Sequence, residues 1–193
     1  MSEVVNLSKG ESVNLTKEVP TLKKVMIGAG WDEKQGGASM DADLALFTLN
    51  SNNQVRGADD FIYFGNLKNN SGSVVHHGDN LTGEGEGDDE VISVNLEALD
   101  PGVERVAIYL DIYQAAQKGQ SLADIDNAHI RIVDEETGKE ISRYDITEPL
   151  QGDTMYFGEL NRTADGWTFT AKGETRTAEL SAIVSEYGLQ AAA

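Results

Sequence analysis

The chain has 193 residues and a formal net charge of −18, because 15 lysines and arginines stand against 33 aspartates and glutamates. So acidic a chain lacks the positive charge that binds nucleic acid phosphates, and anionic lipids repel it. Hydrophobic residues make up 39% of the sequence, which is enough for a core, and the length fits a single domain, residues 1–193. No cysteine is present, which excludes disulfides and thiolate metal sites.

The N-terminal residues alternate apolar and polar side chains, which is not the pattern of a signal peptide. No run of about 18 apolar residues occurs, so no membrane helix is predicted. We therefore expect a cytoplasmic protein that does not insert into a membrane.

Most of the first half has the period of two that is typical of strands. Residues 5–7 and 13–15 are predicted to pair as a hairpin, and residues 25–29 to form the next strand. The apolar runs at 44–49 and 61–64 predict strands that are buried on both faces.

The second half continues with strands predicted at 92–96 and 103–113, and a capping box at Ser121 and Asp124 predicts a short helix. Two hairpins follow, 129–133 with 141–144 and 156–160 with 167–171. Leu180, Ile183, Val184 and Tyr187 share one helical face before Gly188, which predicts a C-terminal helix. About ten short strands and one such helix predict a mainly β protein, a two-sheet β-sandwich with short helices.

The segment 78–90, GDNLTGEGEGDDE, is the most informative part of the sequence. Between residues 79 and 90 it holds six carboxylates and no basic residue, interleaved with glycines. Like charges repel, so a compact loop of this composition needs a cation, and glycines let the backbone wrap closely around it. Oxygen ligands without sulfur suit hard cations, and a supply of roughly 6 to 8 oxygens favours Ca²⁺ over Mg²⁺.

One loop seldom completes a coordination sphere. Asp41 and Asp43 lie two residues apart, on the same side of the chain where it enters the strand at 44–49. With Glu86 set aside as a bystander, seven carboxylates then become available, with an asparagine amide and glycine carbonyls in addition, and this supply fits two Ca²⁺ ions that share bridging carboxylates. The predicted metal ligands are Asp41, Asp43, Asp79, Asn80, Gly83, Glu84, Asp88, Asp89 and Glu90.

Other interpretations of these residues compete with the calcium site. An EF-hand register starting at Asp79 places Leu81 at the third position and Glu84 at the sixth, where an oxygen ligand and a glycine are needed. A solvated acidic loop without metal is the plainer alternative. The adjacent His76 and His77 would point to opposite faces of an extended segment, which does not favour a shared metal ion, and His129 has the pattern of a structural histidine.

The same string resembles the hallmark of the TerD family of tellurium-resistance and stress proteins. The similarity covers nearly the whole chain and includes GAGWD at 28–32, MDADLALFTLN at 40–50 and DDFIYFGNL at 59–67. It implies a β-sandwich with a paired calcium site, in a cytoplasmic bacterial protein that contributes to tolerance of tellurite and other stresses. It also implies partners, namely other tellurite-resistance and stress proteins in a system near the inner membrane, where the chain would lie peripherally.

Carried over position by position, the family's calcium-binding residues fall on Asp41, Asp43, Asp79, Asn80, Glu84, Asp88, Asp89 and Glu90, with Asp32 in second place. The sequence departs from the commonest family pattern at Leu81 and in the tail GLQAAA, and neither departure removes a ligand.

Three functions remain open on the sequence. The favoured one is a non-enzymatic calcium-binding module whose metal orders a surface for partner proteins. The alternative is a metal-dependent hydrolase of a phosphorylated or nucleotide-like substrate, but the loop has no basic residue to hold such a substrate. Direct chemistry on tellurite is disfavoured by the negative potential and by the absence of thiols.

Overall fold

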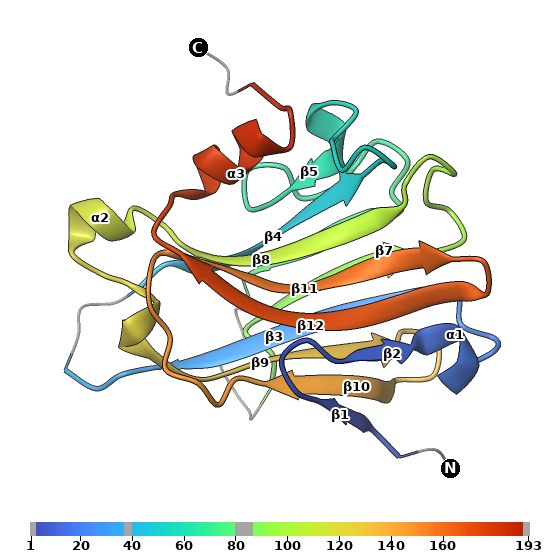
Figure 1. The fold of residues 1–193 in the computed structure, drawn as a ribbon, viewed down its shortest axis with the longest axis horizontal. Coiled ribbons are helices and arrows are strands. Elements are labelled where there is room, and N and C mark those ends of the chain that lie inside the picture. Colours follow the sequence, from blue (N-terminus) through green and yellow to red (C-terminus); the bar gives the residue numbers. More distant parts are fainter. Residues whose placement is uncertain (1–2, 37–39, 80–86, 191–193) are drawn as a thin grey trace.

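The computed structural model describes residues 3–36, 40–79 and 87–190, with only the backbone described at Asp79. In this part of the chain, twelve strands form two six-stranded sheets (Figure 1). The first sheet has the spatial order β1 (Val5–Leu7), β10 (Lys139–Asp145), β9 (Ile125–Asp134), β3 (Lys24–Glu33), β7 (Glu90–Asn95) and β6 (Val74–Asp79). The second has the order β2 (Ser12–Asn14), β12 (Gly166–Arg176), β11 (Thr154–Thr163), β8 (Arg105–Ile112), β4 (Ala42–Leu49) and β5 (Phe61–Ile62). The predicted mainly β, two-sheet fold is confirmed.

The helical elements are short. They are α1 (Leu15–Glu18), the 3₁₀ turn η1 (Ala58–Asp60), α2 (Ala115–Lys118), the 3₁₀ turn η2 (Leu122–Asp124) and α3 (Leu180–Glu186). None of the helices in the described ranges is long and apolar enough to cross a membrane.

The main core lies between the two sheets. Ile27, Ile92 and Ile130 of the first sheet belong to one buried cluster with Leu44 and Ile108 of the second. Alternate residues of each strand point to the same side, so period-two alternation directs one apolar row of every strand into this layer. Each fully buried side chain of this size contributes about 1.5–3 kcal/mol to folding.

A second apolar cluster covers the outer face of the second sheet. Ala45 and Phe47 of β4 point away from the main core and pack with Ile183 of α3 and with Tyr187 directly after it. Helix α3 lies beside β4, β5 and β8 (Figure 1). This packing explains why the run at 44–49 is apolar at every position but Thr48, and it confirms both the doubly buried strand and the C-terminal helix. Gly188 follows the helix with φ 89°, a left-handed conformation that glycine adopts without strain.

The predicted N-terminal hairpin is wrong. β1 pairs in parallel with β10 in one sheet, whereas β2 pairs antiparallel with β12 in the other. The chain crosses between the sheets near Gly10, whose φ is 87°. Strands of three residues give each other few hydrogen bonds, so each gains more by extending a longer strand that is already paired.

The predicted buried strand at 61–64 is half right. Only Phe61 and Ile62 form β5, and Phe64 lies beyond it with 50% of its surface exposed. The two later hairpins are confirmed as β9–β10 and β11–β12. The capping box is also confirmed, although the helix that it begins is the single 3₁₀ turn η2.

Candidate metal centre

The acid-rich segment connects two neighbouring strands of the first sheet. β6 ends at Asp79 and β7 begins at Glu90, and these two residues are register partners. The structure describes the side chains of five predicted ligands: Asp41, Asp43, Asp88, Asp89 and Glu90. Asn80, Gly83 and Glu84 lie outside the described residues, as does Glu86.

Asp88 is held by two side chains from β9. Arg131 Nε lies 3.0 and 2.9 Å from the two carboxylate oxygens, and His129 Nε2 lies 3.2 Å from Oδ1. Burial acts to raise the pKa of Asp88, but hydrogen bonding from His129 and Arg131, with the charge of Arg131, outweighs it and lowers the pKa below its ordinary value. Asp88 is therefore a carboxylate at neutral pH, and Arg131 supplies the positive charge that the loop itself lacks.

Two glycines of β3 make room for this cluster. Gly28 is the register partner of Arg131, and Gly30 is the partner of His129, so all four residues lie on the same face of the sheet. A Cβ atom on Gly28 would overlap the carboxylate of Asp88, and one on Gly30 would overlap the ring of His129. Gly28 is therefore required by the close approach of Asp88 to β3, and Gly30 by the position of the His129 ring.

Asp89 is bound to the backbone of β3. Its N–H donates to the carbonyl of Ala29 at 2.8 Å, and its Oδ2 accepts a hydrogen bond from Trp31 N at 2.7 Å. Burial, together with the negative charges of Asp32 and Asp88, raises the pKa of Asp89, although the Trp31 N–H and His129 oppose the change. Burial is the largest cause of the raised pKa, and the Trp31 N–H and His129 do not fully offset it.

Glu90 points into the core and links the two sheets. Its side chain is 3% exposed, and its Oε2 accepts a hydrogen bond from Leu44 N of β4 at 2.6 Å. His76 Nε2 lies 3.3 Å from the same oxygen, without the angle of a hydrogen bond. Because His76 Nδ1 accepts from Gly78 N at 2.9 Å, a neutral ring carries its proton on Nε2, facing Glu90. Glu90 therefore fixes the start of β7 against the start of β4.

Asp41, which precedes β4, and Asp43, the second residue of β4, have different surroundings. Asp41 is exposed, and its Oδ2 lies 2.8 Å from Lys118 Nζ. Asp43 is half-buried and is the register partner of Asp111 on β8. Strand alternation directs Asp43 to the face opposite that of Leu44. The structure thus brings the two predicted acidic segments to the same end of the sandwich, joined through Leu44 and Glu90. Glu90 of the first sheet points into the core between the sheets, whereas Asp43 points to the outer face of the second sheet.

The donor chemistry of the segment fits a hard divalent cation, since it offers carboxylate and amide oxygens without thiolates. The described residues alone do not complete such a site: within 3–36, 40–79 and 87–190, no three acidic or histidine side chains converge as metal ligands. They form one flank of the predicted site, and further predicted ligands lie among residues 80–86. The calcium site with two ions stays a prediction.

Sequence reasoning missed the basic partners of Asp88. A signal was available, because His129 and Arg131 lie two residues apart in a predicted strand, as Gly28 and Gly30 do in another. Equal spacing of two basic side chains and two glycines indicates that one pair can face the other across neighbouring strands. The spacing does not reveal which acidic residue lies above them.

Comparison with known proteins identifies the family. The model of the TerD domain matches residues 3–187. The chain belongs to the TerD family. It is 41% identical to tellurium resistance protein TerD of Serratia marcescens over 189 residues, covering 97% of this chain and 98% of the relative. It is also 41% identical over 189 residues to general stress protein 16U of Bacillus subtilis (strain 168), covering 96% and 98% of the two chains.

A solved structure shares the TerD-family fold of this chain. The crystal structure of a homologue of telluride resistance protein (TerD) from Streptomyces coelicolor A3(2) superposes with a TM-score of 0.67 at 19% identity, covering 88% of this chain and 99% of the homologue. This similarity supports the two-sheet architecture that carries β6, β7 and the acidic segment.

Proposed function

We propose that this TerD-family protein binds calcium without acting as an enzyme, and that it contributes to tellurite and stress resistance through protein interactions that calcium orders. The observation that carries the proposal is the anchoring of Asp88, Asp89 and Glu90, which are tied to β9, β3 and β4 respectively. Three consecutive carboxylates are thereby held at the end of a segment that contains further predicted ligands. The names of the relatives, tellurium resistance protein TerD and general stress protein 16U, support the resistance role.

In this proposal two Ca²⁺ ions are held by Asp43, Asp79, Asn80, Gly83, Glu84, Asp88, Asp89 and Glu90, with Asp41 at the rim. Bound calcium supplies positive charge that offsets the repulsion between these carboxylates. The protein residues fix one flank in advance, since Arg131 and the N–H groups of Trp31 and Leu44 hold the acidic side chains in place. Calcium bound on this flank would give partners a calcium-dependent surface.

The contacts of the described residues do not favour a metal-dependent hydrolase as a second function. A phosphorylated substrate would need a positively charged group beside the metal, and among the described residues the guanidinium that lies against Asp88 is that of Arg131. Its guanidinium already binds Asp88 and also Glu140, at 3.1 Å from Oε2, so it is engaged by two carboxylates. The relatives are named for resistance or stress response rather than for a reaction.

The partners that we propose are other tellurite-resistance and stress proteins, in a cytoplasmic assembly that reaches the inner membrane peripherally. The net charge of −18 supports this indirect route, because anionic lipids and nucleic acids would both repel the chain.

Calcium titration of the whole chain tests the proposal. We expect a stoichiometry of two by isothermal titration calorimetry. At a calcium concentration of a hundred times the Kd, stabilisation of about 2.7 kcal/mol should raise the melting temperature by roughly 5–10 °C over that in chelator. Asp89→Asn and Glu84→Gln should weaken binding at least as much as the roughly 10- to 100-fold loss that follows removal of an outer-sphere partner.

Asp165→Asn is the matched control, because Asp165 is an exposed acid in the turn between β11 and β12, far along the chain from the predicted ligands. It should titrate like the parent. Equal melting temperatures in calcium and in chelator would disprove calcium binding. Metal-dependent turnover of a phosphoester, lost in Asp89→Asn, would instead establish the hydrolase.

A further inference from the structure

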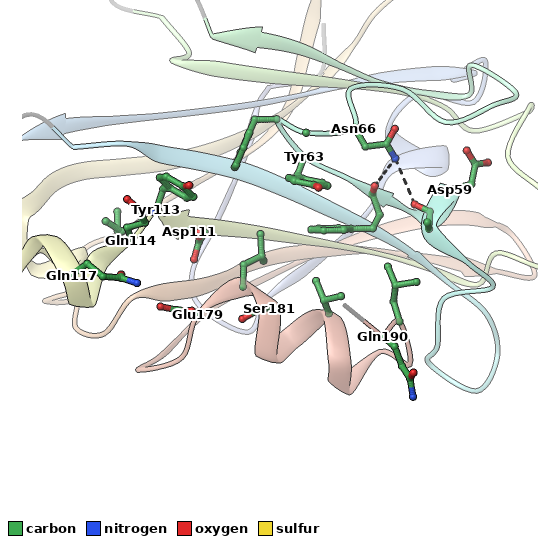
Figure 2. A pocket seen from close by; sticks show the side chains of 18 of the residues that line it. Asp59, Tyr63, Asn66, Asp111, Tyr113, Gln114, Gln117, Glu179, Ser181 and Gln190 are labelled. Carbon is green, nitrogen blue, oxygen red and sulfur yellow. Dashed lines mark hydrogen bonds between the residues drawn. The ribbon is translucent and has the colours of Figure 1, made fainter. Parts of the chain in front are cut away.

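A cavity of about 920 Å³ opens beside α3, on the outer face of the second sheet. Helix α3 forms one wall, and residues 58–66, the end of β8 and the start of α2 form the others (Figure 2). Its volume falls within the roughly 300–1,000 Å³ that small-molecule sites in proteins occupy. None of its lining residues is a predicted calcium ligand.

Aromatic rings line this cavity. Phe61 and Tyr63 stack with ring centroids 4.3 Å apart, and Phe64 meets Tyr63 edge-on at 5.2 Å. The same Phe64 ring packs edge-on against Tyr113 at 5.6 Å. Phe64 is 50% exposed and Tyr113 is 40% exposed, so apolar ring surface faces water in the cavity. A ligand with an apolar body would cover this surface and gain the free energy of its burial.

Acidic side chains stand at both ends of the aromatic wall. Figure 2 shows Asp111 and Glu179 at one end, Asp59 at the other, and Tyr63 between them. In the described part of the chain none of these three acids forms an ion pair with a lysine, arginine or histidine, and no basic residue is among the described residues that line the cavity.

Other acids of this protein are paired with bases. Buried Asp60, next to Asp59 in sequence, pairs with Arg56, and Asp88 pairs with Arg131. The cavity therefore combines ring faces with carboxylates that lack a positive partner, a combination that attracts cations and repels anions.

One ring of the wall already receives a cation. Lys118 Nζ lies 5.3 Å from the centroid of Tyr113, and Asp41 holds the same ammonium at 2.8 Å. The protein thus uses an aromatic face and a carboxylate together to bind an ammonium group at the edge of this cavity.

We propose that the cavity is a binding site for an organic cation with an apolar body, an alkyl- or arylammonium group. The ammonium charge lies near Asp111 and Glu179, and the apolar body packs on Tyr63 and Phe64. A neutral ligand would leave the carboxylates without a positive partner, and an anion would be repelled by all three. This site adjoins two predicted calcium ligands, since Asp111 is the register partner of Asp43 and Lys118 at its edge pairs with Asp41, but it uses other side chains and goes beyond the resistance role proposed above.

Titration with benzyltrimethylammonium, in buffer that contains a calcium chelator, tests this site on the whole chain. We expect saturable binding, with chemical shift changes at residues 61–66 and 111–114. Benzyl alcohol and phenylacetate, which keep the ring but are neutral and anionic, should bind much more weakly. A peptide with one lysine between two leucines tests whether the ammonium group belongs to a protein. If the peptide binds more tightly than benzyltrimethylammonium, the ligand is a side chain of a partner protein; if it binds more weakly, the ligand is a free organic cation. Either outcome supports a cation site.

Two exposed residues supply the variants. Phe64→Ala and Glu179→Gln should each weaken binding of the cation by about fivefold or more, whereas neither change removes a buried group. Leu67→Ala is the control, since Leu67 is 44% exposed but does not line the cavity. Three results would overturn the proposal: no binding of benzyltrimethylammonium, an affinity for phenylacetate equal to that for benzyltrimethylammonium, or an affinity for benzyltrimethylammonium that is unchanged in Phe64→Ala.

Discussion

The ion pair between Asp88 and Arg131 requires that residue 28 has no side chain, and Gly28→Ala tests this requirement. The added methyl group would overlap the Asp88 carboxylate. Asp88 would have to move away from β3, and Arg131 and His129 would then lose an acceptor that lies at 2.9 to 3.2 Å. The substitution should therefore destabilise the protein although alanine is a conservative replacement.

The size of the effect follows from three contributions. Overpacking costs about 1–3 kcal/mol, loss of a charge-assisted hydrogen bond costs about 1.5–3 kcal/mol, and replacing glycine in a strand recovers about 0.5–1 kcal/mol. We expect a net loss of about 1.5–5.5 kcal/mol in the free energy of unfolding.

Urea unfolding in a double-mutant cycle measures this loss. In an Asp88→Ala background the obstructing carboxylate is gone, so Gly28→Ala should cost little there, and the coupling energy should reach about 2 kcal/mol. Gly57→Ala is the control, because Gly57 has an extended φ of 171° and no atom within 4 Å of the position that the added methyl group would take. An equal cost of Gly28→Ala in both backgrounds would show that the Asp88 carboxylate is not the group that excludes a side chain.

Two further predictions concern two buried acids, Asp111 in β8 and Asp60 in the turn η1 directly before β5. Burial raises the pKa of Asp111 to about 6 from 3.8, although Thr154 donates a hydrogen bond to it, so the native state binds more protons than the unfolded chain between these values. The free energy of unfolding should therefore fall by about 3 kcal/mol as the pH rises through this window. Asp111→Asn should abolish that part of the pH dependence, and it should be more stable than the parent at pH 7 but not at pH 4. Urea unfolding at a series of pH values that gave parallel profiles for parent and variant would contradict this prediction. Asp60 accepts hydrogen bonds from Thr48 and Arg56 while 3% exposed, so Asp60→Leu should destabilise by about 3–5 kcal/mol in thermal or urea unfolding, and a loss below 1 kcal/mol would show that the pair is worth no more than a surface one.

The sequence predicts the elements of this fold better than their pairing. The doubly buried strand β4 and the hairpins β9–β10 and β11–β12 follow from local apolar patterns and from turns that join neighbouring strands. The same patterns locate β1 and β2 along the chain, yet each pairs with a partner more than a hundred residues away. No local pattern specifies a partner at that distance.

The candidate site divides in the same way. Composition and spacing identify the acidic segment and the acids Asp41 and Asp43 at the start of β4, because charge density and oxygen ligands can be recognised in the sequence itself. The groups that bind these acids come from other strands: Arg131 from β9, Trp31 from β3 and Leu44 from β4. Their roles depend on strand register, and a backbone N–H carries no sequence signal at all.

By itself the sequence determined that this protein is an acidic β protein of the TerD family with a glycine-rich carboxylate segment, since these properties depend on residue type and order alone. Only the tertiary structure decided that Asp88 meets Arg131 above Gly28, that Glu90 joins the two sheets, and that the aromatic cavity beside α3 has carboxylates without basic partners among its described lining residues. The physical reason is that ion pairing, close approach and cavity shape act through space, between residues that strand register brings together from distant parts of the chain.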